Sequence, residues 1–125
     1  MKKFENARRL WLIAGYFGCA LIAVLSLIPA PSVPRTGLGG SYDHWLAYVA
    51  VGFCFGTGFR SLRLQLMSGL AMTLGAMVLE LLQNFIPGRT PDFSGFMGSS
   101  LGAWSGLAMA ILAYAVLKAF RTLPR

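Results

Sequence analysis

The chain has 125 residues, of which 56% are hydrophobic and only 12% are charged. A soluble globular domain carries about 25% charged residues, so this composition excludes an ordinary soluble domain. The net charge of +7 does not indicate a nucleic-acid binder, because the basic residues lie at the ends of apolar segments and not on one face of a folded domain.

Four apolar segments follow one another along the chain. A membrane-spanning helix needs roughly 20 apolar residues, and each segment is near or above that length. They predict an all-α integral membrane bundle of four transmembrane helices, which forms a single domain over residues 1–125. The predicted helices cover residues 10–28, 42–59, 64–86 and 93–120.

The first segment follows a basic stretch, MKKFENARR, as the apolar part of a signal peptide does. It is longer than the usual apolar region of about 7–15 residues, and it ends in the proline-rich IPAPSVP without a clean cleavage site. We therefore expect a retained membrane anchor.

The basic residues predict how the bundle is oriented. Cytoplasmic loops are enriched in Lys and Arg, and in the four-helix arrangement only Arg35 and Arg89 fall on one side. The other side carries Lys2, Lys3, Arg8, Arg9, Arg60, Arg63, Lys118, Arg121 and Arg125. Both termini are thus predicted to be cytoplasmic, where the basic tails also meet anionic membrane lipids.

Polar residues interrupt the second and third segments near the predicted outer surface. Glu80 lies about 10 Å below the outer end of its helix, and Gln83 shares its face. His44 and Tyr48 share a face of the second helix, while Asp43 points about 100° away. An intramembrane acid usually faces a bundle interior or a wet cavity, which favours a polar pocket here.

Arg89 and Asp92 lie in the loop just after the third helix, so they are expected at the same level of the membrane. Simpler roles stay open for each group. His44 and Tyr48 suit an aromatic belt at the membrane interface. Glu80 suits hydrogen bonding between helices, and Asp92 suits the N-cap of the fourth helix.

Other chemistry has weak support. The chain has one histidine and no metal-ligand spacing motif, so neither a metal nor a cofactor is expected. The serines Ser94, Ser99 and Ser100 lie in a small-residue helix without the G-x-S-x-G pattern of a nucleophilic serine.

The fourth helix has a small residue at every fourth position. Such a ladder allows another helix to approach closely, and the second helix offers two matching glycines. The residues are Ser94, Gly98, Gly102, Gly106 and Ala110 on the fourth helix, and Gly52 and Gly56 on the second. Packing within one chain is the simplest interpretation, and a homodimer interface is the alternative.

Two motifs resemble those of the VanZ-like membrane proteins. They are DHWLAYVAVG, from Asp43 to Gly52, and ELLQNFIPGRTPDF with its continuation SSLGAWSG, from Glu80 to Gly106. The matching residues are His44, Tyr48, Glu80, Gln83, Gly88, Arg89, Gly102 and Gly106. The resemblance implies a small helical protein of the bacterial cytoplasmic (inner) membrane, in a family whose namesake is associated with resistance to a glycopeptide antibiotic.

The chain departs from that family at three positions. Gly40 and Gly95 replace two aspartates that the family often has, and Ser99 replaces an asparagine. If those acids carry chemistry in relatives, this chain lacks it or uses Asp92 instead.

Three functions follow as hypotheses. The first is an envelope protein whose outward-facing pocket binds a lipid-linked or glycan-bearing component, with Arg89 as a fork for an anionic group. The second is a membrane enzyme acting on a lipid-linked substrate, with Glu80 or Asp92 as general base and His44 as acid. The third is a small proton-coupled transporter that uses Glu80.

Overall fold

The computed structural model describes residues 2–33 and 36–122, and Arg35 and Arg125, both used to predict the orientation, lie outside them. Within the described ranges the chain is helical and contains no strand, which confirms the all-α prediction. The four long helices are α1 (Lys2–Leu27), α2 (Gly40–Gly58), α3 (Leu62–Leu82) and α4 (Phe93–Thr122). Two short 3₁₀ helices, η1 (Ala30–Ser32) and η2 (Gln83–Phe85), lie in the first and third connections.

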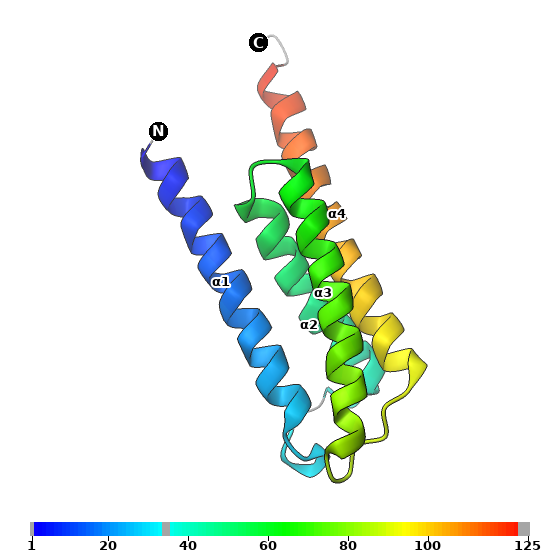
Figure 1. Cartoon of the computed structure of the whole chain (residues 1–125). Helices are drawn as coiled ribbons and strands as arrows, with labels where there is room; N and C mark the ends of the chain where they lie inside the picture. The colour runs from blue at the N-terminus through cyan, green and yellow to red at the C-terminus, as the bar shows by residue number, and fades with distance from the viewer. Residues whose placement is uncertain (1, 34–35, 123–125) are drawn as a thin grey trace.

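The helices run up and down in one bundle (Figure 1). The start of α1, the turn between α2 and α3, and the end of α4 lie at one end. The α1–α2 and α3–α4 connections lie together at the opposite end, which we call the loop end. The turn between α2 and α3 is short, and the side chain of Ser61 caps α3 by accepting a hydrogen bond from the Leu64 N–H, at 3.3 Å.

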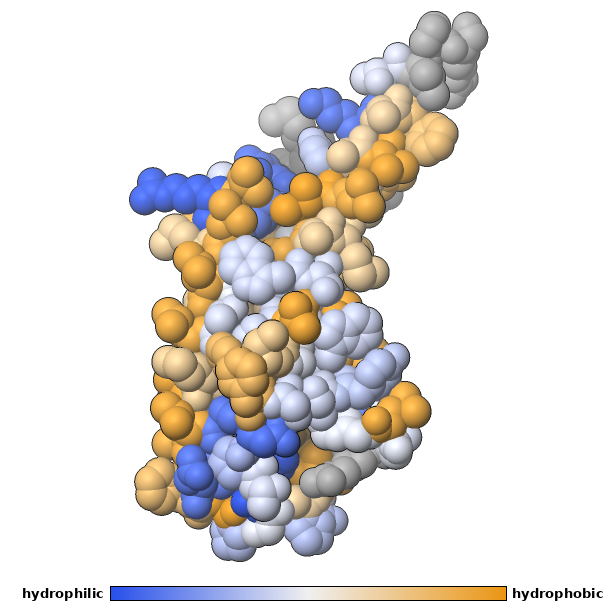
Figure 2. All heavy atoms as spheres, turned by 90° about the vertical axis from the view of Figure 1, so that its right-hand side faces the viewer, coloured by the Kyte–Doolittle hydropathy of each residue, from blue (hydrophilic) through white to orange (hydrophobic). Residues whose placement is uncertain are grey.

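Among the described residues, three helical segments are long and apolar enough to cross a membrane, over Phe4–Leu27, Leu62–Phe85 and Phe93–Thr122. Their outer surfaces carry many exposed large apolar side chains. In Figure 2, hydrophilic residues gather near the two ends of the molecule, with mainly apolar or weakly polar surface between them. The helix α2 is not among these three, and its sequence includes Asp43, His44 and four glycines, which lower its mean hydropathy.

The pair α2 and α4 forms the most extensive helix contact. A Cβ atom at Gly98, Gly102 or Gly106 of α4 would overlap a backbone carbonyl oxygen of α2. Gly52 of α2 lies equally close to the Ala103 carbonyl of α4, and a Cβ at Gly56 would lie 2.6 Å from the Ala110 Cβ. The predicted ladder of small residues on α4 therefore packs against α2 of the same chain, and it lets the backbones of the two helices come into contact.

The helix α3 ends earlier than predicted, at Leu82 and not at residue 86. Ile86 precedes Pro87 and has an extended backbone, with φ −102° and ψ 122°. A residue before proline disfavours the helical conformation, so the chain tightens into η2 and then leaves the helix. Gln83 begins η2 with a helical backbone, its N–H still donates to the Leu79 carbonyl, and its side chain is buried.

Candidate functional site

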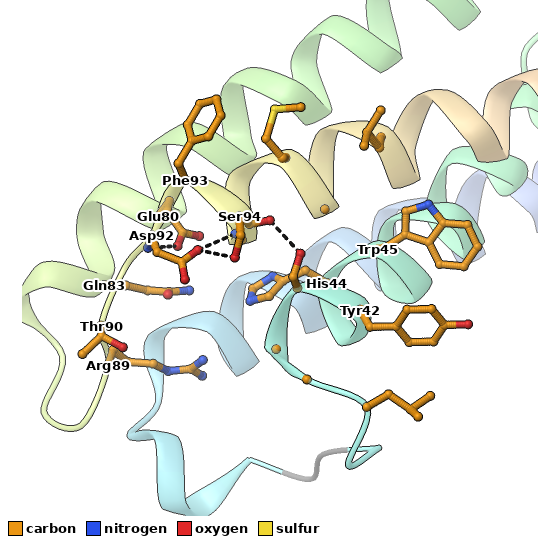
Figure 3. Close-up of a pocket in the computed structure, with 18 of the residues that line it drawn as sticks. Tyr42, His44, Trp45, Glu80, Gln83, Arg89, Thr90, Asp92, Phe93 and Ser94 are labelled. Atoms are coloured by element: carbon orange, nitrogen blue, oxygen red, sulfur yellow. Dashed lines mark hydrogen bonds between the residues drawn. The ribbon is translucent and has the colours of Figure 1, made fainter.

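A cavity of about 1000 Å³ lies at the loop end (Figure 3). The first turns of α2 and α4, the last turn of α3, η2 and the α3–α4 connection surround it. Of the seven residues that the sequence suggested for a polar pocket, five line it: His44, Glu80, Gln83, Arg89 and Asp92. Although His44 and Asp92 lie far apart in the sequence, the up-and-down order of the helices brings their segments to the same end of the bundle.

Glu80 is half-buried and connects α3 with the start of α4. One carboxylate oxygen, Oε1, accepts a hydrogen bond from the Asp92 N–H at 3.0 Å. A Cβ at Gly95 would lie only 2.8 Å from the same oxygen. The glycine at position 95, one of the departures from the VanZ-like pattern, therefore makes room for the Glu80 carboxylate.

Gln83 has the least expected environment of the group. Its side chain is only 3% exposed and lines the cavity. Figure 3 shows it pointing into the space between Glu80 and Arg89, toward His44. Within residues 2–33 and 36–122, its side-chain nitrogen Nε2 has no hydrogen-bond partner. A buried amide donor without a partner costs about 1–3 kcal/mol, so it needs an explanation.

Arg89 binds the end of α1. Its Nε donates to the Ile28 carbonyl at 3.3 Å, and one terminal nitrogen donates to the Leu25 carbonyl at 2.5 Å. The last carbonyls of a helix have no partners within the helix, and a cation there also complements the helix dipole. At least two N–H groups of the guanidinium therefore donate to carbonyls at the end of α1 and not to an anionic ligand.

Asp92 caps α4, as one of the sequence alternatives proposed. Its Oδ1 accepts hydrogen bonds from the Ser94 hydroxyl at 2.6 Å and from the Gly95 N–H at 2.8 Å. These hydrogen bonds, of which the one from the Ser94 hydroxyl has the largest effect, hold the pKa of the Asp92 carboxyl below its ordinary value of 3.8. A carboxylate with these bonds is a poor choice for a general base.

The lowered pKa predicts a pH dependence of stability. Asp92 binds its proton less readily in the folded chain, so its contribution to stability is present above pH 3.8 and is lost as the pH falls through the lowered pKa. Thermal unfolding followed by circular dichroism from about pH 6 to about pH 2 measures this. Asp92→Asn keeps a capping oxygen but does not titrate, so we expect its unfolding midpoint to fall less at low pH than that of the wild type. Parallel curves for the two proteins contradict the assignment.

The remaining predicted residues separate into two groups. His44 lines the cavity and lies within electrostatic reach of Glu80 and Arg89. Asp43 does not line it: its carboxylate accepts hydrogen bonds from the Thr36 N–H and hydroxyl, which fastens the α1–α2 connection to α2. Tyr48 is buried one turn further in, beside Ser99 of α4.

The sequence reasoning missed several other residues of the lining. The Ser41 hydroxyl donates to the Ser94 carbonyl at 2.7 Å, which joins the first turns of α2 and α4. Tyr42 and Trp45 pack against each other, with ring centroids 5.5 Å apart, and both line the cavity. The positions of Tyr42 and Trp45 could have indicated this, because both lie close to His44 in the first two turns of α2.

The cavity is mixed in charge. Its ionisable side chains include the carboxyl groups of Glu80 and Asp92, the imidazole of His44 and the guanidinium of Arg89. The N-termini of α2 and α4 add partial positive charge. In the part of the chain that the structure describes, no group of three or more His, Cys, Asp or Glu residues could hold a metal ion. The lining therefore suits a ligand with many hydrogen-bond donors and acceptors.

No family model, curated protein or solved structure matches this chain.

Proposed function

We propose that the chain is a four-helix, VanZ-like protein of the bacterial cytoplasmic membrane, with cytoplasmic termini and an outward-facing cavity that binds an envelope amphiphile. The ligand is a lipid-linked component with a hydroxyl-rich, glycan-like headgroup. In this arrangement the loop end faces the outer surface, and α2 spans the membrane together with the three more apolar helices.

The observation that carries the proposal is the buried amide of Gln83, which has no hydrogen-bond partner among the described residues and faces the cavity. Buried polar side chains almost always have partners, and ligand pockets usually owe their specificity to a few placed polar groups. A ligand hydroxyl that accepts from Nε2 supplies the missing hydrogen bond.

Charge favours a sugar-like headgroup over a phosphate. The lining has two carboxylates against one guanidinium, and that guanidinium donates to α1. A phosphate would meet two carboxyl groups and a guanidinium that already donates to carbonyls at the end of α1. Sugar hydroxyls donate to carboxylates and accept from amides, so they match both kinds of group. Tyr42 and Trp45 add aromatic surface at the rim.

Substituting Gln83 tests the proposal. Gln83→Met keeps the size of the side chain but removes the amide, so the ligand-free protein should gain about 1–3 kcal/mol of unfolding free energy. The same change should weaken ligand binding about tenfold. Binding is measured by native mass spectrometry with glucosyl-diacylglycerol and diacylglycerol of the same chains, in a detergent without a sugar headgroup.

Asn84→Met is the matched control, because Asn84 is the exposed amide next in η2 and donates to the Leu81 carbonyl at the end of α3. It should leave the preference for the glucosyl lipid unchanged. The proposal fails if the wild type shows no such preference, if it prefers phosphatidic acid, or if Gln83→Met retains the full preference.

A further inference from the structure

A second hollow lies between α1 and α3, with α2 as its floor. Its volume is about 740 Å³, and its lining is almost entirely apolar. We call it the apolar groove; it includes Cys19 and Ile22 from α1, Tyr48 and Phe55 from α2, and Met72 and Gly75 from α3. Its rim includes Tyr16, Met67 and Val78, which are exposed by half or more, so the groove opens to the outside of the bundle.

The apolar groove continues the polar cavity along the same two helices. On α2, His44 lines the cavity, and Tyr48, four residues later, lines the groove. Just past the end of α3, Gln83 lines the cavity, and Leu79, whose carbonyl accepts from the Gln83 N–H, lines the groove. Residues four apart lie above one another on a helix face. The two hollows are therefore one turn apart on both helices.

The buried amide of Gln83 lies at this junction, between the polar cavity and the apolar groove. The other buried side chain at the junction, Tyr48, lies beside Ser99 of α4. A molecule that satisfies Gln83 from the cavity side would thus extend directly toward hydrocarbon surroundings. The two hollows together have the polarity of an amphiphile, with hydrogen-bonding groups at one end and an apolar channel after it.

We propose that the apolar groove holds a hydrocarbon chain of the same amphiphile whose headgroup occupies the polar cavity. This inference rests on the proposed function and adds the lipid part of the ligand to it. Inside a bilayer, hydrocarbon gains little by moving from lipid to protein, so the headgroup must supply the selectivity and the groove must supply a fitting shape. Occupancy of the apolar groove by the hydrocarbon chain should therefore depend on which headgroup the lipid carries.

Photolabelling in nanodiscs tests that dependence. Two probes carry the same diazirine in the acyl chain, one as glucosyl-diacylglycerol and one as diacylglycerol. Labelled peptides are identified by mass spectrometry. We expect the glucosyl probe to label groove residues such as Met67 and Met72 several-fold more than the diacylglycerol probe, and the outer faces of α1 and α4 equally.

Gly75→Leu should block the groove. A Cβ at Gly75 meets no other atom within 4 Å, so this position on the groove wall has room for a side chain to begin. We expect it to abolish the excess groove labelling while a glucosyl lipid with short, six-carbon chains still binds. Leu74→Phe, which adds bulk to the neighbouring exposed position, is the control and should change neither measurement.

The outcomes separate the two proposals. Equal groove labelling by both probes, or full labelling of Gly75→Leu, overturns the inference about the chain, even where the short-chain glucosyl lipid binds in the cavity. Absence of any preference for glucosyl lipids, short or long, overturns the proposed function and this inference with it. Excess labelling that Gly75→Leu removes and Leu74→Phe retains supports the chain site.

Discussion

Gly106→Ala should lower the free energy of unfolding by about 3 kcal/mol. A methyl group at this position would overlap the Val49 carbonyl oxygen and lie 2.7 Å from the Phe53 nitrogen, both backbone atoms of α2. Backbone inside a helix cannot rotate away as a side chain can. The variant must therefore separate α2 from α4 along their shared face, where the bundle has its most extensive contact. Reversible unfolding in mixed micelles, followed by circular dichroism, measures the loss.

Gly75→Ala provides the matched control, since it is the same substitution inside α3 with no atom within 4 Å of the new Cβ. Alanine favours the helix over glycine by about 1 kcal/mol, so this variant should be as stable as the wild type or more stable. A Gly106→Ala protein as stable as Gly75→Ala would show that α2 and α4 do not pack as described.

The second large effect is expected for Arg89→Met, which should destabilise the protein by about 2–3 kcal/mol. The substitution removes the donors that bind the Leu25 and Ile28 carbonyls. The end of α1 then loses its hydrogen bonds to the α3–α4 connection. We expect Cys19, half-buried on α1, to react several-fold faster with a maleimide. Cys54 of α2, also half-buried, reports whether the rest of the bundle stays closed.

Arg60→Met is the control for this experiment. Arg60 also binds α1, through an ion pair with Glu5 at 3.2 Å, but both side chains are more than half exposed. Exposed ion pairs contribute about 0–1 kcal/mol, so the loss should be small. Equal destabilisation by the two substitutions, or unchanged Cys19 reactivity in Arg89→Met, would contradict the role assigned to Arg89.

Much of the architecture follows from the sequence. The apolar segments predicted the helices, and the four-residue spacing of small side chains predicted which face of α4 meets α2. The predicted order of the helices and the distances of His44, Glu80, Arg89 and Asp92 from the helix ends placed them at one level, and the structure gathers them around one cavity. These features depend on helix periodicity and chain order, which a sequence displays directly.

The partners of the polar groups could not be predicted in the same way. Arg89 donates to carbonyls more than 60 positions away, and Glu80 accepts from a backbone N–H in the next connection. Backbone acceptors and donors have no sequence signature, since every residue carries them. The sequence predicted the helix face on which Gln83 lies, but not that its buried amide nitrogen would lack a hydrogen-bond partner among the described residues.

The glycines of this bundle differ in what could compensate for their loss. At Gly15 and Gly18 of α1 the atoms in the way belong to side chains, those of Phe55 and Val51, so a smaller residue on α2 could restore the fit. At Gly98, Gly102 and Gly106 the obstructing atoms include the backbone carbonyls of α2, which no substitution removes. A genetic screen for second-site suppressors should recover partners for the first pair and none on the facing helix for the other three. Substitutions of the α1 glycines can therefore be compensated by substitutions on α2, whereas substitutions of the three α4 glycines cannot.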